Sequence, residues 1–280
     1  MGPKVDQGRR FARDGVDTVV DIHGEGPPVL LLHGFPDTGD LWRHQIPALV
    51  AAGMQVIAPD LRGCGRSDRP EEVGSYAIWQ LAADVTGILD ELGLSSVSVV
   101  GHDLGAALAW YLAIFHPDRV ERLAAFEVGH PLAFRSAGLE QLSRSWYIFF
   151  FQFVGVAEEW LRADNWANFR VWAGHPDAEG VIANIERHDS LTSSLNWYRA
   201  NVTPDTLVAP PLELPSVTCP VLGVWCSGEF ALTEEQMTHS ARYVSGPWRY
   251  ERIEELGHWF MLEAPDVANE LLLDFLMAAR

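Results

Sequence analysis

Asp103 is the residue whose setting most clearly predicts chemistry. It is the middle residue of GHDLG, which follows the apolar run VSVV and precedes the helix-like AALAWYLAIF. A nucleophile flanked by small residues, between a buried strand and a helix, is the pattern of a nucleophile elbow, a strained turn that exposes a reactive side chain. Gly101 and Gly105 would let the strand and the helix approach closely. We therefore predict that Asp103 is a nucleophile.

A carboxylate at a position where most such elbows carry serine limits the reaction. A serine that attacked an sp3 carbon would form an ether, which water does not readily cleave. A carboxylate would form an ester, which activated water can hydrolyse by attack on the aspartyl carbonyl. Asp103 therefore predicts attack on a saturated carbon that bears a leaving oxygen or halide, and argues against ordinary esterase or protease chemistry.

His258, in ELGHWF, is the predicted general base for that water. It follows the last strand-like run, where the chain order of nucleophile, acid and histidine would place it. His116, His175 and His188 lie in polar or helix-end contexts, and we expect them to have surface roles.

The tetrahedral intermediate on the aspartyl carbon needs an oxyanion hole. The stretch HGFP, residues 33–36, directly follows the apolar run VLLL and can aim a backbone N–H at the elbow. We assign the two donors to the N–H groups of Phe35 and Leu104. The nearby turn-rich DLRGCGRSD, residues 60–68, is expected to support the site rather than to take part in the reaction.

The elements that must position these residues alternate between strand-like and helix-like runs. DTVVDIHG, PPVLLLHGF, MQVIAPDLRG, SSVSVVGHD and RLAAFEVGHP have strand character, and LWRHQIPALVAAG, WQLAADVTGILDELG and LGAALAWYLAIF have helix character. Such alternation predicts an α/β fold with a mostly parallel sheet flanked by helices. The continuous apolar runs VLLL and VSVV suit strands that are buried on both faces.

The sequence pattern changes near residue 131, where aromatic, helix-like segments replace the alternation of strand-like and helix-like runs. Strand signals return at TCPVLGVWC and WRYERIE. We therefore expect residues 1–130 and 213–280 to form one core, and residues 131–212 to form a helical cap inserted after the sixth core strand. A cap placed there would cover the carboxyl ends of the strands, where open α/β sheets bind ligands.

Composition excludes some partners. The net charge of the 280-residue chain is −18, which argues against nucleic acid or an anionic membrane surface as a partner. The longest apolar segment, near SWYIFFFQFVGVA, is too short and interrupted to predict membrane insertion. The N-terminus lacks a signal-peptide pattern, and the three cysteines have neither an even number nor a metal-ligand spacing. We expect a cytoplasmic monomer or homodimer without a metal or cofactor.

The motifs HGFP, DLRGCGRSD, GHDLG and GHW, in this order and spacing, resemble the α/β-hydrolase fold over nearly the whole chain. The aspartate nucleophile is similar to that of the epoxide hydrolases and haloalkane dehalogenases of that fold. The resemblance implies a soluble-type epoxide hydrolase that needs no cofactor. Such an enzyme would convert a small, apolar epoxide to a vicinal diol through a covalent hydroxyalkyl-aspartyl ester.

The leaving group distinguishes these two chemistries. Dehalogenases bind the expelled halide with a Trp after the nucleophile and often an Asn in the HGNP loop, whereas this chain has Leu104 and Phe35 there. An opening epoxide instead needs a proton donor such as a tyrosine, whose pKa is about 10. SWYIFFFQFVGVAE and LNWYRANV resemble the two cap segments of epoxide hydrolases that carry such tyrosines, which places the matches on Tyr147 and Tyr198.

The same resemblance implies four residues that line the substrate pocket: Phe35, Gln152, Trp197 and Trp259. It also places the acid that orients His258 on Glu229, where the family usually has Asp. The extra methylene of Glu requires a rotamer or backbone adjustment. Glu127, near the end of the preceding strand, is a rival, because some dehalogenases carry their acid there.

Two other functions remain open from the sequence. One is dehalogenation of a haloalkane or haloacid through the same aspartyl ester, which would not need the cap tyrosines. The other is a ligand-binding relative with vestigial turnover, in which Glu229 serves as a weakened acid.

Overall fold

The computed structural model describes residues 5–210 and 213–278, and its centre is an eight-stranded sheet. The strand order is β1-β2-β4-β3-β5-β6-β7-β8. The β1–β2 and β2–β4 pairs are antiparallel, and all the other pairs are parallel. The strands are β1 (Val5–Arg13), β2 (Val16–His23), β3 (Pro28–Leu32), β4 (Gln55–Asp60), β5 (Val97–His102), β6 (Val120–Phe126), β7 (Val221–Cys226) and β8 (Trp248–Ile253). The predicted α/β class with a mostly parallel sheet is confirmed.

Strand β1 is the one strand that the sequence pattern did not predict. Its residues 6–10 are exposed and mostly polar, and Phe11 is its buried anchor. β1 lies at the edge of the sheet and pairs with β2 alone, with a register shift between Asp6 and Arg9. Because an exposed edge strand buries little, it has no apolar alternation to reveal it.

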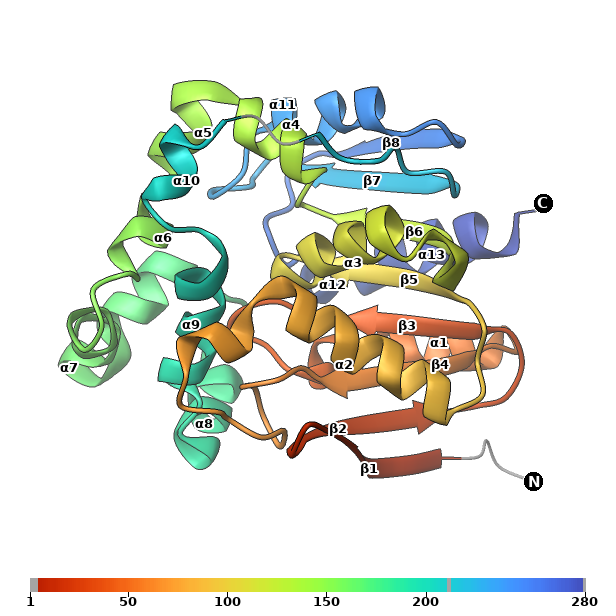
Figure 1. Cartoon of the computed structure of the whole chain (residues 1–280), viewed down its shortest axis with the longest axis horizontal. Helices are drawn as coiled ribbons and strands as arrows, with labels where there is room; N and C mark the ends of the chain where they lie inside the picture. Colours follow the sequence, from red (N-terminus) through yellow and green to blue (C-terminus); the bar gives the residue numbers. More distant parts are fainter. Residues whose placement is uncertain (1–4, 211–212, 279–280) are drawn as a thin grey trace.

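Helices cover both faces of the sheet (Figure 1). The core helices and 3-10 turns are η1 (Gly39–Trp42), α1 (Gln45–Ala51), η2 (Val73–Tyr76), α2 (Ile78–Glu91), α3 (Leu104–Phe115), η3 (Pro117–Arg119), α11 (Glu234–Thr238), η4 (His239–Tyr243), α12 (Phe260–Glu263) and α13 (Pro265–Met277). Leu30 and Leu32 of β3 pack in one cluster with α2 and α3, and Val29 and Leu31 pack in the other with α1, α12 and α13. Burial on both faces explains the unbroken apolar run VLLL.

The chain between β6 and β7 forms a group of helices beyond the edge of the sheet at which the parallel strands end (Figure 1). They are α4 (Pro131–Ser136), α5 (Gly138–Arg144), α6 (Trp146–Phe150), α7 (Val156–Ala173), α8 (Ala178–His188), α9 (Leu191–Asn201) and α10 (Asp205–Val208). Non-helical residues 163–166 break α7 into two pieces. Of the range 131–212 expected to form a cap, residues 211–212 lie outside the described part.

The loop after β4 fastens α9 to the core. The guanidinium of Arg62 donates to both carboxylate oxygens of Asp84 at 2.7 and 2.6 Å, and both side chains are buried. The backbone carbonyl of Arg62 accepts the indole N–H of Trp197 at 2.8 Å, and that of Gly63 accepts the Ser193 hydroxyl at 2.6 Å. This loop is the predicted supporting segment DLRGCGRSD, and it holds the helix that carries Tyr198.

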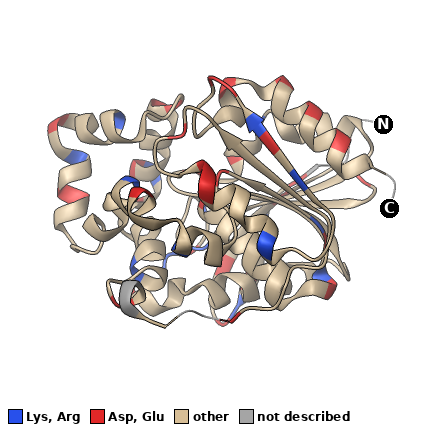
Figure 2. Cartoon of the chain, turned by 90° about the horizontal axis from the view of Figure 1, so that it is seen from above, with Lys and Arg blue, Asp and Glu red and all other residues tan. Residues whose placement is uncertain are grey.

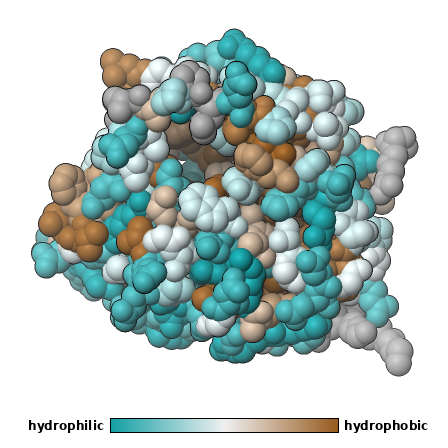
Figure 3. All heavy atoms as spheres, in the orientation of Figure 1, coloured by the Kyte–Doolittle hydropathy of each residue, from teal (hydrophilic) through white to brown (hydrophobic). Residues whose placement is uncertain are grey.

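Charged residues are scattered over the outer helices of both the core and the added helical group (Figure 2). On the face shown in Figure 3 the surface is hollowed between the helical group and the core, and apolar residues lie around the hollow. Among residues 5–210 and 213–278, no helix combines the length and apolar character needed to cross a membrane.

Candidate active site

Asp103 occupies a strained turn between β5 and α3. Its backbone has φ 51° and ψ −125°, a conformation that a non-glycine residue rarely adopts. A Cβ added to Gly101 would lie 2.5 Å from the carbonyl oxygen of Gly105, and one added to Gly105 would lie 2.2 Å from that of Leu32. Both positions therefore require glycine, because the elbow brings strand and helix backbones into contact.

Two backbone N–H groups hold the Asp103 carboxylate. The Phe35 N–H donates to Oδ2 at 2.9 Å, and the Leu104 N–H also donates to this carboxylate. Phe35 lies in the loop after β3, where His33 fixes the backbone by accepting the Leu61 N–H at 2.9 Å. Burial raises the pKa of Asp103, while His258 and these two donors oppose the rise. Two backbone N–H groups therefore converge on one buried carboxylate, an arrangement able to stabilise an oxyanion.

His258 lies between two carboxylates, in the loop after β8. Its Nδ1 is 2.5 Å from Oε2 of Glu229, and its Nε2 is 4.0 Å from Oδ1 of Asp103. Burial disfavours the imidazolium, but Glu229 and Asp103 outweigh it and raise the pKa of His258 to about 9. The histidine is oriented by one carboxylate and faces the other.

Glu229 is held from several sides in the loop after β7. Its Oε1 accepts the Ala231 N–H at 2.6 Å, and its backbone carbonyl accepts the guanidinium of Arg144 at 3.0 Å. Burial raises the pKa of Glu229, but His258 outweighs this, so the net shift is downward. The loop therefore accommodates the extra methylene of Glu while its carboxylate reaches the imidazole.

Glu127, the rival acid, lies directly after β6 and is fully buried. Its backbone has a φ of 67°. Its Oε2 accepts the Cys226 N–H at 3.2 Å, and its carboxyl contacts that of Glu229. Of the two candidate acids, the structure places Glu229 against Nδ1 of His258 and places Glu127 behind it.

Tyr147 from α6 and Tyr198 from α9 meet opposite the elbow. Their ring centroids are 6.0 Å apart, and both side chains are buried. Among the described residues, neither hydroxyl has a hydrogen-bond partner. Burial raises the pKa of both phenols, and the nearby Asp103 carboxylate raises it further. Both remain protonated at neutral pH and are free to donate.

Aromatic rings pack around these phenols, and we call this group of rings the enclosure. The contacting rings are Phe35, Tyr147, Phe151, Trp172, Tyr198 and Phe230. Trp172, from α7, has ring centroids 5.1 Å from Tyr147 and 5.3 Å from Phe151. Phe230 is 39% exposed and stands 5.7 Å from the ring of His258, so it lies at the rim. Neither Trp172 nor Phe230 was identified from the sequence, because no motif or spacing distinguishes them from other aromatics.

Gln152 and Trp197, which were also predicted to line the pocket, make contacts that support the helices. The side-chain amide of Gln152 donates to the backbone carbonyls of Ile148, Tyr198 and Val202, and so joins α6 to α9. The indole of Trp197 packs in the core cluster beside α2 and α3. The structure shows Gln152 and Trp197 in these packing contacts, and their place in the pocket stays a prediction. Phe35, as described above, does belong to the enclosure.

Trp259 and His175 join the helical group to the core behind His258. The Trp259 indole N–H donates to Oδ2 of Asp37 at 2.9 Å, and its ring lies 4.6 Å from that of His258. His175 accepts the Asp177 N–H at Nδ1, so its Nε2–H faces Oδ1 of Asp37 at 3.2 Å. The surface role expected for His175 is wrong, because its side chain is buried in this contact. Its partner is remote in sequence and left no local signal.

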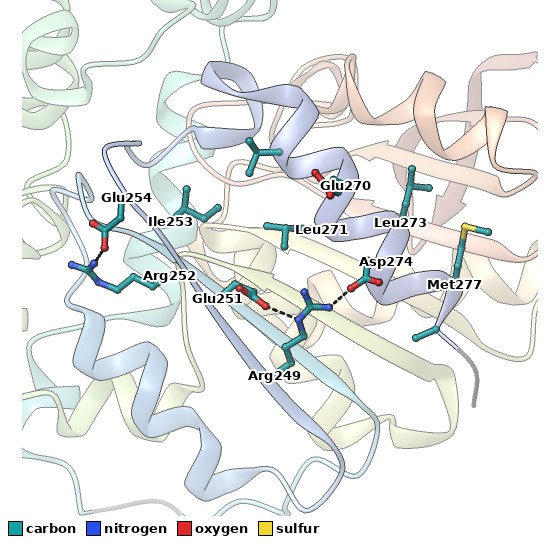
Figure 4. A pocket seen from close by; sticks show the side chains of 12 residues that line it. Arg249, Glu251, Arg252, Ile253, Glu254, Glu270, Leu271, Leu273, Asp274 and Met277 are labelled. Carbon is teal, nitrogen blue, oxygen red and sulfur yellow. Dashed lines mark hydrogen bonds and ion pairs between the residues drawn. The ribbon is translucent and has the colours of Figure 1, made fainter.

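A groove of about 1000 Å³ lies elsewhere, between β8 and α13 (Figure 4). Most of its charged side chains pair with one another: Arg249 reaches Glu251 and Asp274, and Arg252 reaches Glu254. Neither the candidate acids, His258, Asp103 nor the two phenols line it. Among the described residues, no group of three or more His, Cys, Asp or Glu side chains is placed to hold a metal ion.

Known proteins resemble this chain along nearly its full length. The sequence model of the family described as alpha/beta hydrolase fold matches residues 27–265. Epoxide hydrolase A of Mycobacterium tuberculosis is 33% identical, over 92% of this chain and 93% of its own length. The crystal structure of epoxide hydrolase A from Mycobacterium thermoresistibile superposes with a TM-score of 0.82, at 30% identity and 99% coverage of both chains. An inhibitor complex of Bacillus megaterium epoxide hydrolase gives 0.88, at 29% identity, covering 96% of this chain and all of the other.

Proposed function

The chain belongs to the epoxide hydrolase family of the α/β-hydrolase fold, and from this premise we propose that it converts an epoxide to a vicinal diol. The observation that carries the proposal is the pair of unpartnered phenols, Tyr147 and Tyr198, placed against the buried Asp103 carboxylate. One side supplies a nucleophile for carbon, and the other supplies protons for the departing oxygen.

In the first half-reaction, a carboxylate oxygen of Asp103 attacks a ring carbon while the C–O bond of the ring breaks. The ring oxygen keeps the bonding electrons and takes a proton from Tyr147 or Tyr198. The product is a hydroxyalkyl ester of Asp103. Both phenols are buried and protonated, so they can bind the ring oxygen before the bond breaks.

In the second half-reaction, His258 removes a proton from water, whose oxygen adds to the aspartyl carbonyl. The N–H groups of Phe35 and Leu104 stabilise the resulting oxyanion. Collapse breaks the bond between the aspartyl carbon and the alkyl oxygen, which takes the proton from the His258 imidazolium and leaves as the diol. The proton left on the Asp103 carboxylic acid then returns to the tyrosinate and restores the phenol. Esterification removes the charge of Asp103, one of the charges that raise the pKa of His258. The imidazole therefore becomes neutral more readily at the stage when it acts as a base.

Halide release is less well supported. Trp172 carries a buried indole N–H without a hydrogen-bond partner among the described residues. However, the residue after Asp103 is the apolar Leu104 and not the Trp of dehalogenases. Phe35 stands where dehalogenases often have the halide-binding Asn. The short contact between His258 and Glu229 argues against a vestigial, ligand-binding role, because this contact orients the base that ester hydrolysis needs.

Several finer properties belong to the same proposal. The aromatic enclosure supports a small, apolar epoxide as the substrate. Residues 131–212 would act as the cap over the core formed by residues 1–130 and 213–280. The three cysteines are unpaired and buried, which supports a location in the reducing cytoplasm. We propose a monomer or homodimer that works without a cofactor or metal.

The direct test is a parallel assay of aryl epoxides, alkyl epoxides, haloalkanes and haloacetate, with diol and halide measured separately. We expect diol without halide from the unmodified protein, and neither product from Asp103→Asn. Halide without diol would replace the proposal with dehalogenation. Tight binding of these compounds without either product would indicate the vestigial, ligand-binding relative.

A further inference from the structure

Glu127 and Glu229 form a pair of buried carboxyl groups behind His258. Glu127 is 0% exposed and Glu229 is 4% exposed, and the two side chains are in hydrogen-bonding contact. Two ionised carboxylates have no proton to share, so this contact requires a proton on one of them. The mechanism described above uses Glu229 alone and leaves Glu127 without a role.

The surroundings decide which carboxyl keeps the proton. Glu229 accepts from His258 and from the Ala231 N–H, which suits an ionised group. Glu127 receives the Cys226 N–H at Oε2 and contacts the Cys226 thiol, which is a weak donor, and its Oε1 is buried without a donor. Among the described residues, no Lys or Arg side chain pairs with Glu127. A charge on Glu127 would therefore be poorly compensated in a dry site.

The backbone at Glu127 is held for this contact. Its φ of 67° lies in a region that a non-glycine residue rarely occupies. The Gln236 side chain stabilises it, because its Nε2 donates to the Glu127 carbonyl at 2.8 Å and its Oε1 accepts the Gly129 N–H at 2.5 Å. Burial and the charge of Glu229 both raise the pKa of Glu127 well above its ordinary value.

We propose that Glu127 is a neutral carboxylic acid that donates a hydrogen bond to the Glu229 carboxylate. It is a positioning residue for the hydrolytic half-reaction, and this role rests on the proposed function. The donated bond fixes the longer glutamate in the rotamer that reaches Nδ1 of His258. It also stabilises the Glu229 charge in the dry site without adding a second charge beside the imidazole.

Two substitutions separate this role from a structural one. Glu127→Gln keeps a neutral donor of similar shape, so we expect kcat within about threefold and an unchanged apparent pKa for ester hydrolysis. Glu127→Met removes the donor. We expect kcat and KM to fall together by about tenfold or more, with kcat/KM unchanged, because alkylation precedes the affected step. Mass spectrometry should show more of the ester on the Asp103 peptide during turnover.

A spectroscopic test does not depend on any substrate. The infrared spectrum at pH 8 should contain a carboxylic-acid C=O band that disappears in Glu127→Gln. Glu158→Gln is the matched control, since Glu158 is a buried glutamate paired with Arg199 at 2.9 Å, and its loss should remove no such band.

Three results would overturn the proposal: no acid band lost in Glu127→Gln, a lowered apparent pKa of hydrolysis in that variant, or full kcat in a folded Glu127→Met. The first two would mean that Glu127 is ionised in the native protein. If the protein did not turn over epoxides but the acid band were present, the proposed function would be wrong and the proposal for Glu127 and Glu229 would stand.

Discussion

The imidazole of His258 faces the carboxylate of Asp103 across 4.0 Å, from Nε2 to Oδ1, and the two share no hydrogen bond. The Asp103 carboxylate is instead bound through its Oδ2 to the Phe35 N–H. In the proposed mechanism, this separation leaves Asp103 free to attack carbon and keeps His258 close enough to direct a water at the ester. Attack and hydrolysis can therefore be separated by substitution.

Replacing His258 with Gln should stop the reaction at the ester. Attack by Asp103 needs no base, so we expect one equivalent of alkylation followed by a stall, with steady-state turnover reduced by at least about a thousandfold. Mass spectrometry of the digested protein checks this by the mass of the Asp103 peptide. Asp103→Asn is the control and should show no adduct. An unmodified peptide in a folded, substrate-binding His258→Gln protein would exclude the covalent route.

The two phenols should act in ring opening alone. Tyr147→Phe and Tyr198→Phe each remove one proton donor, and we expect each to lower kcat/KM for epoxides by about a hundredfold, with a larger loss in the double variant. Any activity towards a haloalkane should survive, because a halide leaves without a proton. Tyr250→Phe is the matched control, since its hydroxyl binds Glu234 away from the site. Full epoxide turnover by the double variant would contradict the assignment.

The basicity of His258 should depend on the charge of Asp103. Burial disfavours the imidazolium, but Glu229 and Asp103 together raise the pKa to about 9. Asp103→Asn removes a negative charge, as the ester does, so the pKa of His258 should fall in that variant. At a fixed pH below the pKa of His258, a larger fraction of the His258 side chains is then neutral. Titration of the His258 ring by NMR in both proteins measures the change. An unchanged or higher pKa of His258 in Asp103→Asn would show that the charge of Asp103 does not raise it.

Trp172 should determine preference among epoxides. Its ring contacts Phe35, Tyr147 and Phe151 in the enclosure, so Trp172→Ala removes a wall of it. We expect kcat/KM for an aryl epoxide to fall by about tenfold relative to that for a small alkyl epoxide. Trp160→Ala is the control, because Trp160 contacts Trp146 and Phe150 instead. Equal losses for both substrates would show that Trp172 contributes to stability and not to selection.

The contact between His175 and Asp37 should stabilise the folded protein. Both groups are buried, and His175→Leu would leave Oδ1 of Asp37 without its partner. We expect the free energy of unfolding in urea to fall by about 3 kcal/mol. His188→Leu, at the partly exposed end of α8, should change it by less than about 0.5 kcal/mol. Equal stability of the two variants would mean that this contact contributes nothing measurable.

Much of the fold and part of the site can be predicted from local patterns. Unbroken apolar runs identified the buried parallel strands, and GHDLG identified the elbow, because glycine spacing encodes its backbone turn directly. The exposed edge strand β1 was missed for the converse reason: its pairing with β2 leaves few buried side chains to form a pattern.

The sequence by itself determined the core strands other than β1, their order along the chain and the identity of Asp103 as a candidate nucleophile. Only the tertiary structure decided which acid meets His258, since Glu127 and Glu229 follow neighbouring strands, β6 and β7, and both lie close to His258. It likewise decided that Trp172 lines the enclosure and that His175 is buried. The physical reason is that a strand or a turn is set by neighbouring residues, whereas a side chain's partners come from segments that only packing brings together.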